Sequence, residues 1–201
     1  FDDTGSDLLS MEGVHNGRLY DDAAFRRGFK ILSDKGLAFD GYHYYHQTAC
    51  FTDLARAFPG TTMVIDHLGT PLGVGAYKGR QAEIFAQWKK DLTELAKCAN
   101  VNMKLGGPAM PWCGMGFEAD AAPPSSDAFV ARQNDYYQFA IQTFGPERCM
   151  FESNFPVDKC GVSYAVLWNA FKKIAAPYSE AEKDAMFRGT AARVYRIAAK
   201  A

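Results

Sequence analysis

The sequence lacks the features that indicate a membrane, secreted or nucleotide-binding protein. No apolar run approaches the ~20 residues of a membrane-spanning helix, and the amino end has neither the basic start nor the apolar centre of a signal peptide. No GxGxxG turn, Walker-type loop or GxSxG elbow is present. The five cysteines form no CxxC pair, which favours free thiols in a reducing compartment. We therefore expect a cytoplasmic protein.

Runs of like charge are also missing. The 22 Lys and Arg residues nearly balance the 23 Asp and Glu residues, for a net charge of −1, which argues against nucleic acid or an acidic membrane surface as a partner. With 201 residues, 48% of them hydrophobic, the chain is long enough to bury a core, and we expect one domain over residues 1–201. The expected partner is a small-molecule substrate, and a homo-oligomer is left open.

What the sequence does contain is a repeated pattern of apolar runs that end in polar residues followed by Gly or Pro. These runs cover residues 38–47, 63–72, 101–107 and 149–157. Each is typical of a buried parallel strand that delivers polar side chains at its carboxyl end. Helical patterns lie between them, so the sequence predicts an α/β fold with right-handed crossovers. A complete (β/α)₈ barrel needs eight strands and ~250 residues. Four strands make half a barrel or an open three-layer sheet.

Four motifs follow one another along the chain: IDHLGTPLGVGAY, NVNMKLGG, FGPERCMFESNFPVDK and SEAEKDAMFRGTAARVYRI. In this order and spacing they resemble the carboxyl-terminal half of the amidohydrolase-superfamily TIM barrels related to lactonases and predicted metal-dependent hydrolases. The resemblance implies that the four strands, with one helix in front, are barrel strands five to eight. It also implies that the amino-terminal half, including the His-x-His pair of strand one, is missing from this sequence. We expect residues 1–19 to be a loop cut from a longer protein.

Histidines mark two of the predicted strand ends. His67 ends the central strand, where an imidazole binds a divalent metal or donates a hydrogen bond to a substrate carbonyl. The alternative is a buried histidine bonded to a backbone carbonyl. The resemblance to the family's strand-six histidine favours a functional role for His67. His43 and His46 end the preceding strand, and alternation puts them on opposite faces. His46 is nearer the rim, so we match it to the strand-five ligand, with Gln47 as a substrate-contacting neighbour. The resemblance thus implies a divalent metal such as zinc at His67 and His46.

Asn154 departs from the family pattern. Related enzymes carry an aspartate after the strand-eight serine, where it binds the metal and takes a proton from the attacking water. An amide has no ionisable proton and cannot be a general base. Asp158 replaces it only if the loop folds back, and a surface pair with Lys159 is the alternative. The departure argues against metal-dependent water activation. It is still compatible with a metal that the amide oxygen holds more weakly.

Three further positions carry weaker signals. Lys104 lies within a strand, where a buried lysine needs a partner or a role, unless it reaches out to solvent. Glu152 is expected to pair with Arg148. Trp112 and the methionines on either side of it line a ring or acyl pocket, or they seal the barrel mouth. We take Lys104 and Trp112, together with Gln47 and Asp158, as candidate substrate contacts.

The combined interpretation is an enzyme, a hydrolase of the amidohydrolase type that acts on a small carbonyl compound, with lactones ahead of amides. Water attacks the ring carbonyl while His67 polarises it, directly or through a metal, and His67, His46 and Asn154 should converge within about 10 Å. The alternatives are a decarboxylase on the same scaffold and an inactive or truncated barrel that serves for binding or assembly. Side chains expected to face the barrel interior are Tyr42, Tyr44, Met63, Ile65 and Phe151.

Overall fold

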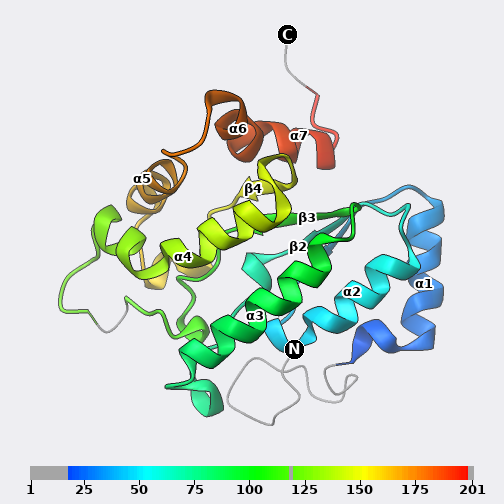
Figure 1. Cartoon of the computed structure of the whole chain (residues 1–201), viewed down its shortest axis with the longest axis horizontal. Helices are drawn as coiled ribbons and strands as arrows, with labels where there is room; N and C mark the ends of the chain where they lie inside the picture. The colour runs from blue at the N-terminus through cyan, green and yellow to red at the C-terminus, as the bar shows by residue number, and fades with distance from the viewer. Residues whose placement is uncertain (1–17, 118–119, 199–201) are drawn as a thin grey trace.

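The computed structural model describes residues 18–117 and 120–198 (Figure 1). Its strands form one parallel sheet in the order β1-β2-β3-β4. The strands are β1 (Phe39–Gly41), β2 (Met63–Ile65), β3 (Val101–Leu105) and β4 (Cys149–Phe151). Each new strand is added beside the previous one with a helix between, as in the wall of a barrel. The predicted α/β fold with four parallel strand-helix units is confirmed.

The described helices are α1 (Ala23–Asp34), α2 (Thr48–Ala57), α3 (Gln81–Ala96), α4 (Ser126–Phe144), α5 (Tyr164–Ile174), α6 (Glu180–Asp184) and α7 (Thr190–Val194). The predicted capping box at the start of α6 is present, with Ser179 and Glu182 bonding each other's backbone N–H groups. The closing helix predicted from Ser179 onward is split, because a π-helical turn, Ala185–Gly189, separates α6 from α7. No helix within the described ranges is long and apolar enough to cross a membrane.

The first strand is shorter than predicted. Pairing with β2 covers only Phe39 to Gly41, whereas the apolar run continues to residue 45. Beyond the strand the backbone turns away from the sheet, because the Tyr44 N–H donates to the Gln47 side chain (3.0 Å) and the Tyr45 N–H donates to the Thr70 carbonyl (3.2 Å). A 3-10 turn, Tyr45–Gln47, follows. The histidine-bearing segment is therefore a loop above the sheet.

Alternation along the strands separates two apolar faces. Met63, Ile65 and Phe151 belong to the main core, which they share with α2 to α5. Val64 and Met150 lie on the other face and pack against α7. The expectation that Met63, Ile65 and Phe151 face a barrel interior is wrong. Both faces of a buried parallel strand are apolar, so the sequence pattern alone cannot tell which set points inward.

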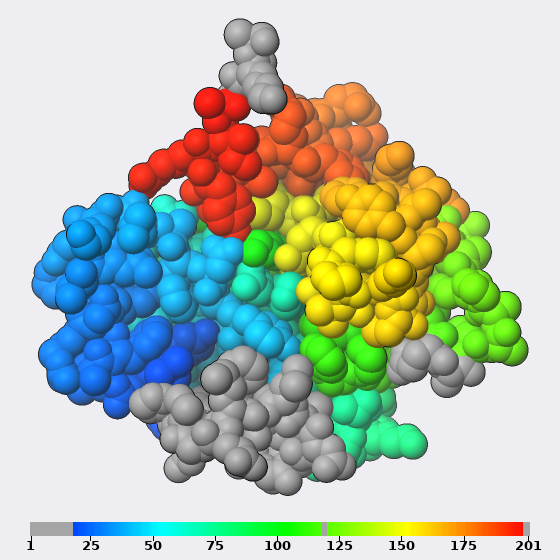
Figure 2. Space-filling view, turned by 180° about the vertical axis from the view of Figure 1, so that it is seen from behind, coloured from blue at the N-terminus to red at the C-terminus, as the bar shows by residue number. Residues whose placement is uncertain are grey.

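The end of α7 lies across the second face of the sheet. The Arg193 guanidinium donates to Asn102 Oδ1 on β3 (3.2 Å), and the Tyr195 hydroxyl donates to Asp40 on β1 (2.8 Å). Figure 2, seen from behind, shows the red carboxyl-terminal residues reaching in between the blue α1 region and the yellow residues near β4. The last described turn of the chain is thus bonded to both the first and the third strand.

Candidate functional site

His67 opens a turn of left-handed residues that directly follows β2. The φ angles are 55° at His67, 54° at Leu68, 65° at Gly69 and 41° at Thr70. A side chain with a Cβ crowds the backbone in this region, and a β-branched residue such as Thr70 does so most. Backbone of this kind persists only where neighbouring groups fix it, and it gathers at functional sites. The turn therefore marks the end of β2 as a candidate site.

His67 is bonded twice to Glu152, which follows β4. Glu152 Oε1 accepts from the His67 backbone N–H at 3.1 Å, and it also makes a hydrogen bond with His67 Nδ1. Both side chains are mostly buried, with exposed fractions of 17% and 16%. Burial lowers the His67 pKa, but the hydrogen bond and negative charge of Glu152 outweigh it, and the pKa is raised overall. The described residues provide no partner for Nε2.

Two glycines at the end of β3 make room for this pair. A Cβ on Gly106 would lie 2.4 Å from Glu152 Cγ, and a Cβ on Gly107 would lie 2.5 Å from the Cβ of His67. Gly107 also has φ +89°, which residues with side chains rarely adopt. Strand β3 lies between β2 and β4, so only a bare backbone there lets Glu152 reach His67.

Asp158 lies beside the pair because the loop after β4 folds back on itself. The Asp158 N–H donates to the Asn154 carbonyl (3.1 Å), and Asn154 Nδ2 donates to Asp158 Oδ1 (2.7 Å). Asp158 is 1% exposed, and burial raises its pKa to about 7, against the bonds from Asn154 and Gly107 and the charge of His67. The loop thus folds back, as Asp158 would require in order to replace the aspartate that related enzymes carry at the position of Asn154. The Asp158 carboxylate is bonded to Asn154, and Lys159 is exposed to solvent, so the alternative surface pair is not seen among the described residues.

Lys104 lies on the second face of the sheet and forms ion pairs with two carboxylates. Its ammonium is 2.6 Å from Asp40 and 2.9 Å from Asp66, the residue that precedes His67. It also lies 5.7 Å from the centre of the Tyr195 ring. Burial lowers the Lys104 pKa, but the two carboxylates raise it further, so the group is a fixed cation. The partner that a buried lysine requires is present.

The rings of Tyr44 and Tyr42 lie in sequence between His46 and His67, so the two histidines do not contact each other directly. The His46 ring stacks on Tyr77, with centroids 6.0 Å apart, whereas the His67 ring packs edge-on against Tyr42 at 5.2 Å. His43 is buried between the Tyr20 and Thr48 hydroxyls, and burial lowers its pKa to about 3. His43 is therefore a core residue, and the metal-ligand role of His46 stays a prediction.

Two candidate substrate contacts have structural partners. The Gln47 side chain caps the Tyr44 N–H, as described above, and is buried. Trp112 lies in a 3-10 turn, Pro111–Cys113, and packs on a small cluster that includes Met110 and Met115. Met110, Cys113 and Met115 form this cluster apart from the main core, and both arrangements expected for it stay predictions. Their roles toward a substrate stay predictions.

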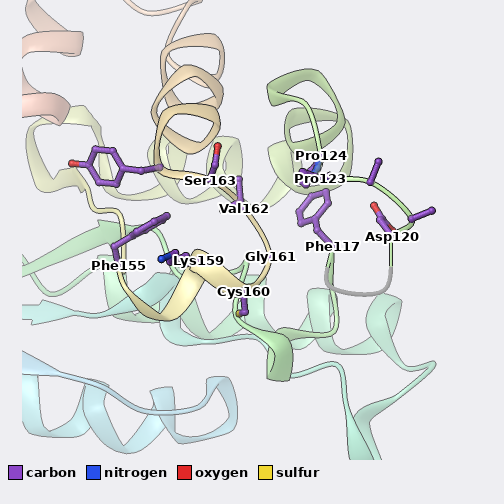
Figure 3. A pocket seen from close by; sticks show the side chains of 13 residues that line it. Phe117, Asp120, Pro123, Pro124, Phe155, Lys159, Cys160, Gly161, Val162 and Ser163 are labelled. Carbon is purple, nitrogen blue, oxygen red and sulfur yellow. The ribbon is translucent and has the colours of Figure 1, made fainter.

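A cavity of about 550 Å³ lies next to the folded-back loop. Figure 3 shows Phe117 and Pro124 on one side of it and Phe155 and Val162 on the other. Lys159 also lines it, as does Asp120, whose charge is matched by Arg132 at 3.1 Å. This volume is in the range of small-molecule sites, and the walls are mainly apolar.

Glu152 is the site residue that sequence reasoning missed. Its expected partner, Arg148, instead donates to the backbone carbonyls of Phe144, Ala96 and Cys98. The signal that could have identified Glu152 is the paired Gly106 and Gly107 at the end of the neighbouring strand. Two adjacent glycines there indicate that a side chain from another strand crosses over them.

The donor set of the described residues does not fit a divalent metal. They contain no group of three His, Cys, Asp or Glu side chains that could hold one. His67 Nδ1 is already bonded to Glu152, and Asn154 directs its N–H donor, not a lone pair, at Asp158. A metal at this rim would need ligands from outside the described residues, so we assign no chemical step to one.

Comparison with known proteins identifies the family. The sequence model of the amidohydrolase family matches residues 9–197. The chain belongs to the amidohydrolase family. This amidohydrolase is 36% identical over 176 residues to the uncharacterized protein y4mH of Sinorhizobium fredii, covering 86% of this chain and 52% of that protein. It is 29% identical over 178 residues to an L-fucono-1,5-lactonase of Burkholderia multivorans, covering 88% and 57%. The chain spans about half the length of these curated relatives.

Solved structures show the same relationship. An amidohydrolase from Burkholderia multivorans with bound HEPES superposes with a TM-score of 0.77 at 28% identity, covering 93% of this chain and 62% of that one. A second crystal form of the Burkholderia amidohydrolase, with bound zinc, gives a TM-score of 0.75 at 25% identity, with the same coverage. A 5-carboxyvanillate decarboxylase from Sphingomonas paucimobilis, at 17% identity and a TM-score of 0.54, shares the fold.

Proposed function

We propose that this amidohydrolase hydrolyses a small carbonyl compound, with lactones as the substrate class, at the strand ends that carry His67, Glu152 and Asp158. The observation that carries the proposal is the double hydrogen bond between His67 and Glu152. The similarity to an L-fucono-1,5-lactonase supports the choice of a lactone. A cytoplasmic location and a zinc-type metal supplied with further ligands stay expectations from the sequence.

In this proposal His67 is the hydrogen-bond donor that polarises the lactone carbonyl. Its Nδ1 is held by Glu152, which fixes the ring orientation and favours the protonated imidazole. The Nε2–H is then directed at the carbonyl oxygen of the lactone, which gains negative charge as water adds. A charged donor fixed in a mostly buried site stabilises that charge more than solvent does. Glu152 acts through His67 as a positioning residue.

Asp158 is the general base in this proposal. With a pKa of about 7 it is partly ionised at neutral pH, where it can take a proton from water and later return it. The water oxygen bonds to the carbonyl carbon, the ring C–O bond then breaks, and the departing ring oxygen takes up the proton. The product is a single hydroxy acid, which carries the new carboxyl group and the freed hydroxyl group. Asn154 holds Asp158 in place through its amide N–H.

The test is a lactonase assay on the intact protein with a set of five- and six-membered sugar lactones, read by acid release. Removing either the donor or the base should cost roughly 100-fold or more in kcat/KM, so His67→Gln and Asp158→Asn should both be nearly inactive. Glu83→Gln, at an exposed position that is paired with Arg80, is the matched control. Aromatic carboxylic acids assayed in parallel test the decarboxylase alternative. Full activity in both site variants would contradict the proposal.

A further inference from the structure

The turn that carries His67 is held by side chains that lie outside the reacting groups. We propose that Trp88 and Lys104 are positioning residues, which fix the left-handed turn from Asp66 to Thr70 and so direct the His67 imidazole. This inference rests on the proposed function for its catalytic meaning. Its structural content, the placement of the ring, stands independently of it.

The turn needs such support because its own backbone disfavours it. Three of its four consecutive left-handed residues, His67, Leu68 and Thr70, carry a Cβ. Each would relax more readily to negative φ if nothing fixed it. A change at any of them would rotate the chain at His67 and break its two hydrogen bonds to Glu152. External anchors are therefore required on the carbonyls and side chains of this turn.

Trp88 supplies one anchor from helix α3. Its indole Nε1–H donates to the Leu68 carbonyl at 2.6 Å, and the side chain is fully buried. The ring cannot move away easily, because it packs between Phe85, with centroids 5.6 Å apart, and Tyr136, at 5.1 Å. Trp88 touches none of the groups assigned to the reaction. Its hydrogen bond fixes the peptide one residue after His67.

Lys104 supplies the second anchor from β3. Its ammonium holds the Asp66 carboxylate at 2.9 Å, immediately before His67, and is itself held by Asp40 at 2.6 Å. The Tyr195 hydroxyl donates to the same Asp40 carboxylate at 2.8 Å. The start of the turn is therefore tied to β1, β3 and the end of α7. Because the ammonium group is already paired with both carboxylates, we assign Lys104 a positioning role and not a substrate contact.

The test compares two tryptophans in the intact protein. Trp88→Phe keeps an aromatic ring and removes the N–H donor, while Trp168→Phe removes a buried indole N–H that has no described acceptor. The readout is the downfield NMR signal of His67 Nδ1–H, assigned with His67→Gln, and its exchange with water. Trp88→Phe should weaken the signal and speed its exchange, whereas Trp168→Phe should leave both unchanged. In the lactonase assay kcat should fall roughly fivefold to tenfold with KM nearly constant.

A folded Trp88→Phe protein with the wild-type Nδ1–H signal would overturn the role of Trp88. If Trp88→Phe does not fold, the same measurement on Lys104→Met and Lys104→Arg tests the proposal. The Lys104 side chain is partly exposed, so its replacement should disturb folding less. Lys104→Met should lose the signal and Lys104→Arg should keep most of it, and equal spectra for the two would overturn the proposal. The NMR readout needs no substrate. A protein that hydrolyses no lactone but shows these changes would refute the proposed function and leave the positioning roles standing.

Discussion

Glu152 accepts hydrogen bonds from two atoms of His67, the backbone N–H and ring Nδ1, and so joins the end of β4 to the end of β2. The bond crosses over β3, where Gly106 and Gly107 leave space for it. One carboxylate therefore fixes both the backbone and the ring of the histidine. The proposed function rests on this pair of hydrogen bonds.

Replacing Glu152 by Gln should reduce kcat/KM by roughly 100-fold while the fold is kept, because a neutral amide no longer favours the protonated imidazole. Lactone hydrolysis measures the loss, and circular dichroism checks the fold. Glu83→Gln removes a carboxylate from the exposed face of α3 and serves as the control. A folded Glu152→Gln enzyme with wild-type kcat/KM would show that the pair is not required.

Gly107→Ala should destabilise the protein by roughly 2 to 4 kcal/mol, because the added Cβ meets His67 and the backbone is left-handed there. Gly60→Ala is the matched control, since a Cβ at that position meets nothing within 4 Å. Urea unfolding followed by fluorescence gives the free energy of unfolding of both variants. Equal stability would mean that the backbone near His67 can shift freely.

The strand pattern and the family could be predicted from the sequence because apolar runs that end in polar residues repeat along the chain. His67 was singled out for the same reason, whereas the sequence left open whether the loop that carries Asp158 folds back. The partner of His67 was not, because Glu152 lies 85 positions away and only the missing side chains at Gly106 and Gly107 hint at it. The surroundings of His46 could not be predicted either, since a 3-10 turn lifts that segment off the sheet.

Asp158 should make the protein less stable as the pH rises. Its pKa is 3.8 in its ordinary state and about 7 when buried in the fold, so the stability present below pH 3.8 is lost as pH rises through about 7. The loss by about pH 8 is at most roughly 4 kcal/mol. His67, with a raised pKa, acts in the same direction. Urea unfolding of Asp158→Asn should show a weaker decline between about pH 5 and pH 8, and an unchanged decline would contradict the burial of this carboxyl.

Asn154→Asp should increase the affinity for divalent metal in the intact protein, because it places a second carboxylate within hydrogen-bond distance of Asp158. Calorimetric titration with zinc, and metal analysis after dialysis, measure the change. Asn134→Asp, on the α4 helix, adds the same charge elsewhere and is the control. The same zinc content in Asn154→Asp and in the unmodified protein would indicate that this position lies away from any metal.

The most direct test of the central claim is the pH profile of kcat/KM for lactone hydrolysis by the intact protein. The account predicts one limb that rises at about pH 7, as Asp158 becomes ionised, and one limb that falls as His67, whose pKa is raised, loses its proton. In Asp158→Asn the residual activity should lose the rising limb and keep the fall. A profile that is flat between about pH 5 and pH 9, or a rising limb that survives in Asp158→Asn, would contradict the account.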